Sequence, residues 1–481
     1  SNVGILLPQG PANLLANAAL TLERRTAVHG NYTLDDATLK GCFERAGVRY
    51  VITSRRFLKV LEREAPVAVD HVLFVEDLLK DVGGADKAAA FLWTLLPSGW
   101  LAHLRSPQRS SDEIAAVLFS SGSSGTPKAV QLTHGAVLSN VQSSLQVLAF
   151  GPGDALLGVL PYFHAFGYTI GMWASALAGA KSCTHPDPLG TDAITKLCQE
   201  HACTAVIGTP TFFQTWLRRC PAEIFQAMRM CVCGAQRLPA DLADAWREAT
   251  GNELLEGYGA TELGPVVACN VQAPEGTSPR HRGHQVGSVG RPLPGVVVRA
   301  VHPETRAVLT SGEEGLLEVK SPSMMVGYLG QDAETAEVLR DGWYVTGDIG
   351  RVEPDGFLVI TDRLSRFSKI GGEMVPHGRV EETLRATLAA HLRDAGLEPG
   401  TDTDIAVTAI EDERRGEQLV VLCAQVPIPL ADLADALNAT DLPPLFRPKP
   451  ANFIEVDAIP QLASGKVDLG AIRRLAAERL G

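Results

Sequence analysis

The sequence predicts an α/β protein with a large N-terminal domain of parallel sheets, a small barrel-like β subdomain and a small α+β C-terminal domain. Three observations predict this fold class. Short apolar runs alternate with helical patterns in the first part of the chain, which is typical of strand–helix–strand units. A Gly/Pro-rich β region follows from Gly287 to Val319, and a new α+β pattern begins at about Gly371.

The first elements are two strands and two helices. Strands are predicted at Val3–Pro8 and Val48–Thr53, and helices at Pro11–Arg24 and Thr38–Ala46. A domain that opens directly on a parallel strand is unusual. The segment from Asp70 to Arg109 has no motif that we can assign.

Composition narrows the class of protein. The 481 residues are 45% hydrophobic and 20% charged, which is ordinary for a globular chain of two to four domains. The net charge of −12 argues against broad nucleic-acid binding. Nine cysteines, an odd number with no framework, indicate a reducing, cytoplasmic compartment and core positions. A zinc site at Cys231-Val-Cys233 is the alternative, although a second ligand pair is lacking.

One uncharged stretch, Ala155 to Ala180, is long enough to span a membrane. Pro161, His164 and several glycines interrupt it, so we predict a strand, a turn and a buried helix, with a transmembrane helix as the alternative. The first ten residues lack the charged region and the long apolar run of a signal peptide.

A small-residue loop follows the predicted buried strand Ile114–Phe119, and Ala129–His134 then leads into a helical pattern. Glycines let backbone amides turn inward, hydroxyls donate hydrogen bonds, and Lys128 carries a positive charge, so the loop suits a polyphosphate. Its spacing differs from that of the P-loop, and a flexible linker is the alternative. The loop residues proposed to bind phosphate are Ser120, Ser121, Gly122, Ser123, Ser124, Gly125, Thr126 and Lys128.

A second motif runs from Leu254 to Gly264. Tyr258 offers a flat face to a purine beside Gly259, Thr261 offers a hydroxyl to a phosphate, and Glu262 offers a carboxylate to Mg²⁺. A helix N-terminus rich in capping residues is the alternative. Farther along, two strands around a turn are predicted at Gly342–Gly350 and Asp355–Ile360. Asp348, in the first of them, is a carboxylate of the kind that binds ribose hydroxyls.

In their order along the chain, from Ser120 to Asp468, these motifs resemble those of the adenylate-forming superfamily, which includes acyl-CoA synthetases, luciferases and nonribosomal adenylation domains. The resemblance implies that Arg363 assists Asp348 at the ribose, and that Lys466 is catalytic. It also implies that the turn Gly234, Ala235 and Gln236 meets adenine, and that His164 borders an acyl tunnel together with Phe166. On their own, a Gly-Ala turn, a lone histidine and a surface lysine carry little information.

The resemblance implies a reaction and a domain division. A carboxylate and MgATP would give an acyl-adenylate and pyrophosphate, with Thr261, Glu262, His164 and Lys466 as catalytic residues and Glu262 as the metal ligand. Residues 1–362 would form the AMP-binding domain and 363–481 a mobile lid. In the family a strand like Val3–Pro8 is normally preceded by further secondary structure, so we expect the first domain to lack its natural start. Two positions depart from the family pattern: Ala129 replaces a glycine, and Ser365 replaces the hinge lysine or aspartate.

The thiol that accepts the acyl group is predicted from the resemblance of three segments to one branch of the superfamily. Val3–Pro8, Phe163–Gly167 and Arg366–Val375 resemble the acyl-acyl carrier protein synthetase module of bacterial enzymes that are often fused to a lysophospholipid acyltransferase. This implies a fatty acid, acyl carrier protein as partner, and membrane association through a fused acyltransferase or transporter region outside this chain. A long-chain fatty acyl-CoA ligase, with CoA as partner, and a silent nucleotide-binding scaffold are the alternatives.

A group of cations near the hinge is the predicted docking site for an acidic carrier. Arg363, Arg366, Lys369 and Arg379 lie within seventeen residues, and the last three are expected to face the carrier. A solvated loop at a domain boundary is the alternative.

Overall fold

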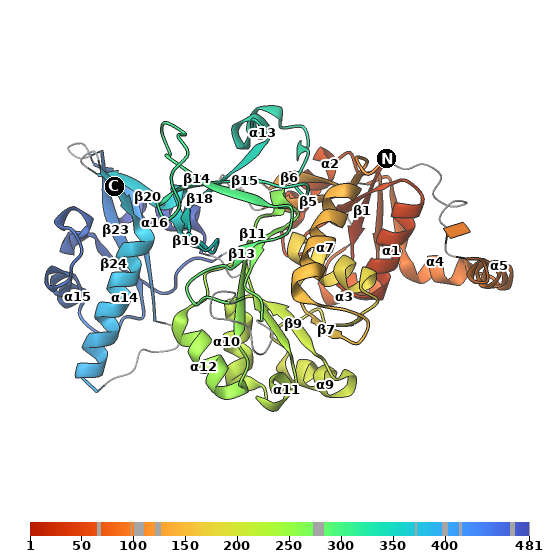
Figure 1. Cartoon of the computed structure of the whole chain (residues 1–481), viewed down its shortest axis with the longest axis horizontal. Helices are drawn as coiled ribbons and strands as arrows, with labels where there is room; N and C mark the ends of the chain where they lie inside the picture. Colours follow the sequence, from red (N-terminus) through yellow and green to blue (C-terminus); the bar gives the residue numbers. More distant parts are fainter. Residues whose placement is uncertain are drawn as a thin grey trace.

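Four sheets organise the chain (Figure 1). The computed structural model describes residues 1–64, 69–97, 99–100, 110–120, 127–272, 283–370, 373–396, 403–412, 416–461 and 467–480. The first two sheets each have seven strands and the other two have five, and apolar clusters fill the spaces between the sheets and their helices.

The first sheet has the strand order β16-β6-β5-β2-β1-β3-β4. Its strands from β5 to β4 are parallel, whereas β6 pairs antiparallel with β5 and β16 pairs antiparallel with β6. The strands are β1 (Asn2–Leu6), β2 (Thr26–His29), β3 (Tyr50–Thr53), β4 (His71–Phe74), β5 (Ile114–Ser120), β6 (Lys128–Thr133) and β16 (Gly327–Tyr328). The helices among them are α1 (Pro11–Leu22), α2 (Asp36–Arg45), α3 (Arg55–Val60), α4 (Val75–Asp81), α5 (Gly84–Thr94) and α7 (His134–Leu148).

The second sheet has the order β13-β12-β11-β10-β9-β7-β8. The pairings β13–β12 and β12–β11, at one edge of the sheet, are antiparallel. The strands are β7 (Ala155–Gly158), β8 (Lys181–Thr184), β9 (Ala205–Gly208), β10 (Met230–Cys233), β11 (Leu254–Gly259), β12 (Val266–Cys269) and β13 (Arg291–Pro292). The helical segments are the π-helix η1 (Gly167–Ala174), α8 (Ser175–Leu177), α9 (Thr191–His201), α10 (Pro210–Arg219), α11 (Glu223–Gln226), α12 (Ala240–Thr250) and the 3₁₀ turn η2 (Thr261–Leu263).

The third sheet is antiparallel and open, so the predicted barrel-like subdomain is an unclosed sheet. Strand β18 carries β15 on one side and both β17 and β19 on the other. Its elements are β14 (Val297–Val301), β15 (Gly315–Lys320), β17 (Leu339–Arg340), β18 (Trp343–Val352), β19 (Leu358–Arg363) and helix α13 (Asp332–Val338).

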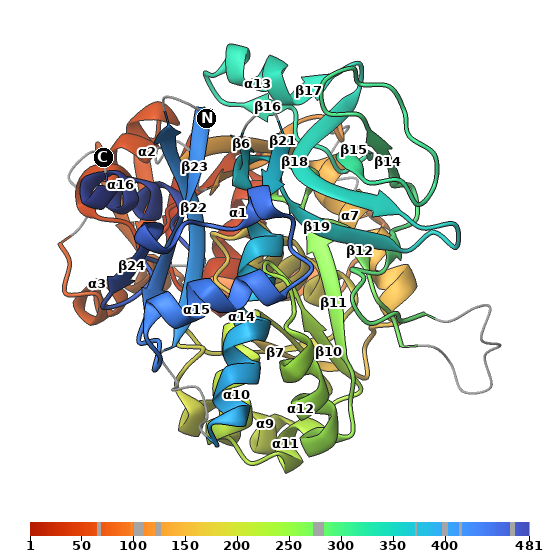
Figure 2. The same ribbon diagram turned by 90° about the vertical axis from the view of Figure 1, so that its left-hand side faces the viewer.

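The fourth sheet lies in the C-terminal part, in front in Figure 2. It has the order β21-β20-β23-β22, with β24 on the other end of β23. Its elements are β20 (Phe367–Ile370), β21 (Glu373–Pro376), β22 (Asp404–Asp412), β23 (Gly416–Ala424), β24 (Phe453–Val456) and helices α14 (His377–Asp394), α15 (Leu430–Ala436) and α16 (Leu469–Leu480). The 3₁₀ turn η4 (Leu364–Arg366) precedes this sheet.

The fold class predicted from the sequence is therefore confirmed, with one local difference at the small-residue loop. The chain leaves that loop as strand β6, which pairs with β5 from Ser120↔Lys128 onward, and helix α7 begins only at His134. From Val130 to Thr133, buried and half-buried residues alternate, which is the period of a strand. Lys128 is therefore fixed opposite Ser120 across a hairpin.

Ala155–Ala180 forms β7, a turn, η1 and α8, as predicted. Among the described residues, no helix is both long and apolar enough to cross a membrane. All nine cysteines are unpaired and eight are buried. The described residues contain no cluster of three His, Cys, Asp or Glu side chains suited to a metal, and Cys231 and Cys233 are both buried.

Candidate active site

The carboxylate of Glu262 lies where the first two sheets meet. Strand β11 ends at Gly259 and the chain turns into η2, which carries Glu262 into a nearly buried position. Its Oε1 accepts hydrogen bonds from the Ser120 hydroxyl at 3.3 Å and from the Tyr328 phenol at 3.0 Å. The end of β5 and the short strand β16 thus hold the carboxylate from the side of the first sheet.

Lys128 contacts the same tyrosine that donates to this carboxylate. Its Nζ lies 4.8 Å from the centre of the Tyr328 ring, within the range of a cation–π contact. The described residues include no cation paired with Glu262. The predicted metal ligand and the predicted phosphate-binding lysine therefore share one partner, Tyr328.

The second carboxylate, Asp348, lies on β18 and is buried. Its Oδ2 accepts from the Tyr258 phenol at 2.5 Å, and its Oδ1 accepts from Nε of Arg363 at 2.8 Å. Asp348 and Arg363 face each other across β18 and β19, so the register of one hairpin sets the ion pair. Burial and the negative charge of Asp348 raise the pKa of the Tyr258 phenol, and the same charge raises the pKa of Arg363.

Two buried tyrosines connect the carboxylates. The phenols of Tyr328 and Tyr344 interact, and burial is the largest cause of the raised pKa of both groups. The charge of Glu262 and the proximity of Tyr258 raise the pKa of Tyr344 further. All three phenols therefore stay protonated and can act as donors. Tyr344 is coupled electrostatically both to Glu262 and to Tyr258, so the Glu262 and Asp348 centres share one electrostatic environment.

The turn that carries Glu262 is tightly supported. A Cβ at Gly259 would lie 2.1 Å from the carbonyl oxygen of Pro265, so only glycine fits there. Nδ2 of Asn140 donates to Val266 O at 2.8 Å, Thr169 donates to Gly264 O at 2.9 Å, and Met325 N donates to Glu262 O at 2.8 Å. Thr261 is half-buried at the start of η2.

The predicted adenine turn lies beside the His164 segment. Gly234 is packed so closely that an added Cβ would come within 3.4 Å of both Gly257 O and the Phe166 ring. Ala235 has φ = 70°, a left-handed conformation that is uncommon for alanine and costs free energy. Gln236 completes the turn. The ring of half-buried His164 packs against the ring of Phe163, with 4.5 Å between the ring centres. Phe166 follows two residues later.

Several predicted residues lie outside the described part of the chain. They are Ser121, Gly122, Ser123, Ser124, Gly125 and Thr126 of the small-residue loop, and Lys466. The flanking residues are described: Ser120 pairs with Lys128, and Gln461 forms an antiparallel bridge with Val467. The roles of the seven residues stay predictions.

The predicted carrier-docking cations are only partly available, so that prediction was wrong for Arg366. The Nη2 of Arg366 lies 2.5 Å from Glu381 Oε1, and its Nε lies 3.8 Å from Asp362 Oδ1. Arg366 is therefore held in ion pairs within the protein and is not a free surface charge. Lys369 and Arg379 are exposed. Two cations thus remain of the three that were expected to face a partner.

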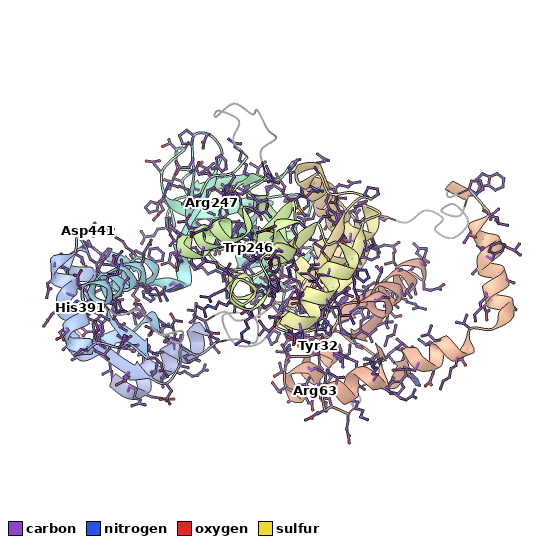
Figure 3. All side chains as sticks on the ribbon, turned by 90° about the horizontal axis from the view of Figure 1, so that it is seen from below. Tyr32, Arg63, Trp246, Arg247, His391 and Asp441 are labelled. Atoms are coloured by element: carbon purple, nitrogen blue, oxygen red, sulfur yellow. The ribbon has the colours of Figure 1, made fainter. Side chains whose placement is uncertain are left out.

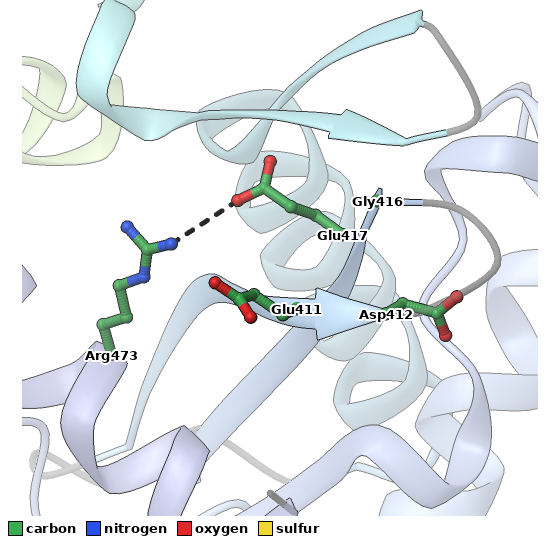
Figure 4. Close-up of a pocket in the computed structure, with 5 residues that line it drawn as sticks. All are labelled: Glu411, Asp412, Gly416, Glu417 and Arg473. Carbon is green, nitrogen blue, oxygen red and sulfur yellow. Dashed lines mark ion pairs between the residues drawn. The ribbon is translucent and has the colours of Figure 1, made fainter.

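Two hollows lie away from the carboxylates. One, of about 360 Å³, lies in the C-terminal part and is lined by Glu411, Asp412, Gly416, Glu417 and Arg473 (Figure 4). It contains none of the predicted site residues. The other is a small apolar cavity between α7, η1 and strands β7, β9 and β10, lined by Ser144, Leu145, Leu148, Phe150, Leu156, Ile170, Ala174, Ile207 and Met230.

Sequence reasoning missed the residues that position the carboxylates. Tyr328 belongs to a two-residue strand, and Tyr344 opens β18 as part of the buried core. Asn140 is buried in α7 without a motif around it. The aromatic residues Tyr328 and Trp343-Tyr344 at glycine-flanked positions were the available signal, since buried tyrosines normally need a polar partner.

Two nearly buried carboxylates at a sheet junction of an α/β protein are compatible with several classes of enzyme. Comparison with known proteins decides among these classes. The family model described as AMP-binding enzyme matches residues 1–329, and the chain belongs to this family. It is 30% identical over 364 residues to a long-chain-fatty-acid–CoA ligase of Bacillus subtilis, covering 74% of this chain and 60% of that protein. It is 31% identical to a feruloyl-CoA synthase of Amycolatopsis, covering 76% and 70%.

Solved structures confirm the fold over nearly the whole chain. ATP-bound MatB from Rhodopseudomonas palustris has a TM-score of 0.80 at 24% identity, covering 100% of this chain and 90% of that one. The o-succinylbenzoate CoA synthetase of Bacillus subtilis, in complex with an acyl-adenylate, has a TM-score of 0.78 at 23% identity, covering 98% and 88%. At these identities the likeness establishes architecture.

Proposed function

We propose that the protein is an ATP-dependent acid–thiol ligase that activates a fatty acid as its acyl-adenylate. The observation that carries the proposal is the joined pair of carboxylates, Glu262 and Asp348, on the two motifs expected to hold Mg²⁺ and ribose in a chain of the AMP-binding family. Fatty-acid–CoA ligases from Bacillus subtilis and Escherichia coli among its relatives support the acid.

The residues present fit MgATP. Glu262 is a hard oxygen ligand that lacks a cationic partner among the described residues, which suits a divalent metal. Asp348 has both oxygens engaged by donors and lies beside Tyr258, whose ring can stack on a purine. ATP supplies the electrophilic phosphorus and the pyrophosphate leaving group.

The residues of this chain would divide the remaining work. Lys128 and the small-residue loop hold the phosphate oxygens, Asp348 and Arg363 fix the nucleoside, and Glu262 keeps the metal in place. Negative charge develops on phosphate oxygens during attack by the carboxylate, so fixed cations near them lower the barrier. Lys466, from the C-terminal part, is proposed to reach both the α-phosphate and the acid. In this proposal, residues 1–362 and 363–481 are separate domains.

The acyl chain is proposed to enter the apolar cavity between α7 and η1. His164 and Phe166 immediately precede η1, and a π-helix is a rare form that often occurs at functional sites. The cavity holds only about 10 Å³, so binding requires side chains such as Leu145 and Ile170 to move. Each buried methylene contributes about 0.8 kcal/mol, so two further carbons should tighten binding about tenfold until the cavity is full.

CoA is the first candidate for the acceptor, because the curated relatives are CoA ligases or synthases and Arg366 is unavailable for a carrier. Acyl carrier protein is the second, favoured by the likeness of Arg366–Val375 to carrier-protein synthetases and by exposed Lys369 and Arg379.

The testing experiment measures pyrophosphate release from ATP with acids of 4 to about 18 carbons, followed by thioester formation with CoA or with carrier protein. We expect acid-dependent pyrophosphate release and one preferred thiol. Release that is independent of any acid, or ATP binding without release, would leave the silent scaffold as the better reading.

Replacement of Lys466 separates the two half-reactions. We expect Lys466→Ala to reduce adenylate formation by about 10²–10³-fold, the usual effect of removing one group that stabilises developing charge. Thioester formation from a synthetic acyl-adenylate should remain close to wild type, because this lysine is proposed to act only in the first step. Lys449→Ala, at an exposed lysine of the same region, is the control.

A further inference from the structure

Helices α4 and α5 form an arm on the outer edge of the first sheet, and neither helix has a buried residue. Figures 1 and 3 show the arm extending from the body on the side opposite the C-terminal sheet. We use the name projecting arm for α4, α5, Leu95–Pro97 and Trp100. Strand β4, which leads into α4, is the edge strand of the sheet.

The projecting arm concentrates exposed apolar side chains. Of the twenty large apolar side chains that are exposed in the described chain, seven lie on the arm, so the clustering is not a general property of the surface. Five of these are between 63% and 69% exposed. The seven are Leu78, Leu79, Val82, Phe91, Leu92, Leu95 and Trp100.

The orientation of α4 is the reverse of an ordinary surface helix. Its acidic residues face the protein: Glu76 accepts from the Ser54 hydroxyl at 2.6 Å, and Asp77 pairs with Arg55 at 2.6 Å. Leu78 and Leu79, the next two residues, are left outside. The hydrogen bonds and the ion pair therefore fix the apolar face toward solvent, which indicates a surface that something apolar covers.

Helix α5 continues the same face. Phe91, Leu92 and Leu95 lie within one arc of the helix, with Ala88 between them. Lys87 borders this arc one turn before Phe91, and Asp86 lies on the other side. The sequence from Ala88 to Trp100 has no charged residue and includes two tryptophans. Tryptophan, phenylalanine and leucine together are typical of segments that lie in the interface of a bilayer.

We propose that the projecting arm docks on the surface of a lipid bilayer. A partner protein is the weaker choice, because protein interfaces carry a polar rim and hydrogen-bonding groups, and Thr94 and Ser98 are the only polar side chains in the uncharged run. The run is also too short to span a membrane, so the arm would lie in the interface plane.

Charge decides the kind of lipid surface. The arm carries two lysines, Lys80 and Lys87, against four acids, Glu76, Asp77, Asp81 and Asp86, and the whole chain has a net charge of −12. Binding is therefore driven by apolar burial: it should be insensitive to salt on neutral phosphatidylcholine vesicles and weaker on vesicles that contain anionic lipid. If the proposed function holds, a fatty acid dissolved in the same bilayer would be within reach of the enzyme; docking itself does not depend on that activity.

The test is vesicle flotation in the absence of ATP and acid. Wild type should float with phosphatidylcholine vesicles, and Leu92→Glu/Leu95→Glu should bind at least tenfold more weakly, since each leucine contributes about one order of magnitude or more. The matched control is Leu189→Glu/Val308→Glu, at two exposed apolar positions away from the arm, and should float as wild type does. Melting temperatures should be unchanged, because the arm residues are not part of the core.

Two further measurements keep the outcome decisive. Brominated phosphatidylcholine should quench tryptophan fluorescence in wild type, and Trp93→Phe/Trp100→Phe should abolish most of that quenching. Sedimentation velocity of the vesicle-free protein should show the same state for wild type and for the Leu92→Glu/Leu95→Glu variant. Absence of flotation for wild type, equal flotation of the arm variant, or a wild-type dimer that the arm substitutions dissociate would each overturn the proposal.

Discussion

Glu262 and Asp348 are both nearly buried carboxylates of the candidate active site, yet they differ in their partners. Asp348 has each oxygen matched by a donor, and one of these donors, Arg363, is a cation. The two hydrogen bonds that Glu262 accepts from described residues both end on Oε1, and both donors, Ser120 and Tyr328, are neutral.

Among the described residues, Asp348 has a donor on each oxygen and a cationic partner, whereas Glu262 has neutral donors on one oxygen only. A buried anion without a cation is costly, because neutral donors offset only part of its lost hydration. Asp348 is therefore suited to hold a neutral group such as a sugar hydroxyl through fixed geometry. Glu262 is suited to bind a positive charge. The comparison therefore predicts that substitutions at the two centres change different parameters, the Mg²⁺ dependence at Glu262 and the affinity for ATP at Asp348.

Glu262→Gln should give the largest effect. Glutamine keeps the acceptor for Tyr328 and Ser120 and removes the negative charge, so we expect metal affinity to fall by at least about 100-fold, the upper end of what a supporting residue contributes. ATP–pyrophosphate exchange, titrated with Mg²⁺, measures it. An unchanged Mg²⁺ midpoint would show that the metal is held elsewhere.

Asp348→Ala should act on nucleotide affinity and leave the Mg²⁺ midpoint in place. The change removes the acceptor of the Tyr258 phenol and the counter-charge of Arg363, and hydrogen bonds to a charged group contribute about 1.5–3 kcal/mol. The expected rise in KM for ATP is therefore about 10- to 150-fold. Asp348→Asn, which keeps one acceptor, is the control and should give a smaller rise.

The tyrosines offer a matched pair with smaller effects. Tyr328→Phe removes one donor to Glu262, and Tyr258→Phe removes one donor to Asp348. Each hydrogen bond contributes about 0.5–1.5 kcal/mol, or about 2- to 12-fold. We expect Tyr328→Phe to change the Mg²⁺ dependence and Tyr258→Phe the KM for ATP. If both variants changed the same parameter, the two centres would not be separable.

Those parts of the two centres that depend on neighbouring residues could be predicted from the sequence. Tyr258, Thr261 and Glu262 come from one stretch, and a strand that ends in small residues is sufficient to place them together. Arg363 opposite Asp348 follows from one hairpin. The α/β class and most long elements were also predictable, because apolar runs and helical periods repeat over many residues.

The remaining features depend on distant packing. Tyr328 lies 66 residues from Glu262 and belongs to a strand of two residues, which has no period to detect. Strand β2, of four residues, was missed for the same reason. Arg366 was expected to be free because its partners, Glu381 on α14 and Asp362 on β19, are brought to it only by the folded chain. The projecting arm fell in the segment without assignable motifs.

A third carboxylate tests whether partners or burial decide the state of an acid in this region. Glu256 lies on β11, two residues before Tyr258, and is as buried as Glu262. Its Oε1 accepts one hydrogen bond, from Leu238 N at 3.0 Å. Burial raises the pKa of Glu256 to about 7, and the amide of Leu238 and the charge of Arg237 offset this only in part.

The raised pKa gives a pH dependence of defined sign. Between about pH 4.5 and 7 the folded protein holds a proton on Glu256 that the unfolded chain has lost, so the stability contributed by this group falls as pH rises through that window. Glu256→Gln keeps the acceptor and removes the ionisation. Its free energy of unfolding should therefore match wild type near pH 4.5 and exceed it above pH 7 by up to about 3 kcal/mol, at about 1.4 kcal/mol for each pKa unit. Urea unfolding at several pH values measures the difference, and Glu253→Gln, at a more exposed position nearby, should show no such trend. A constant offset across the window would mean that the partners of Glu256 are sufficient to keep it ionised.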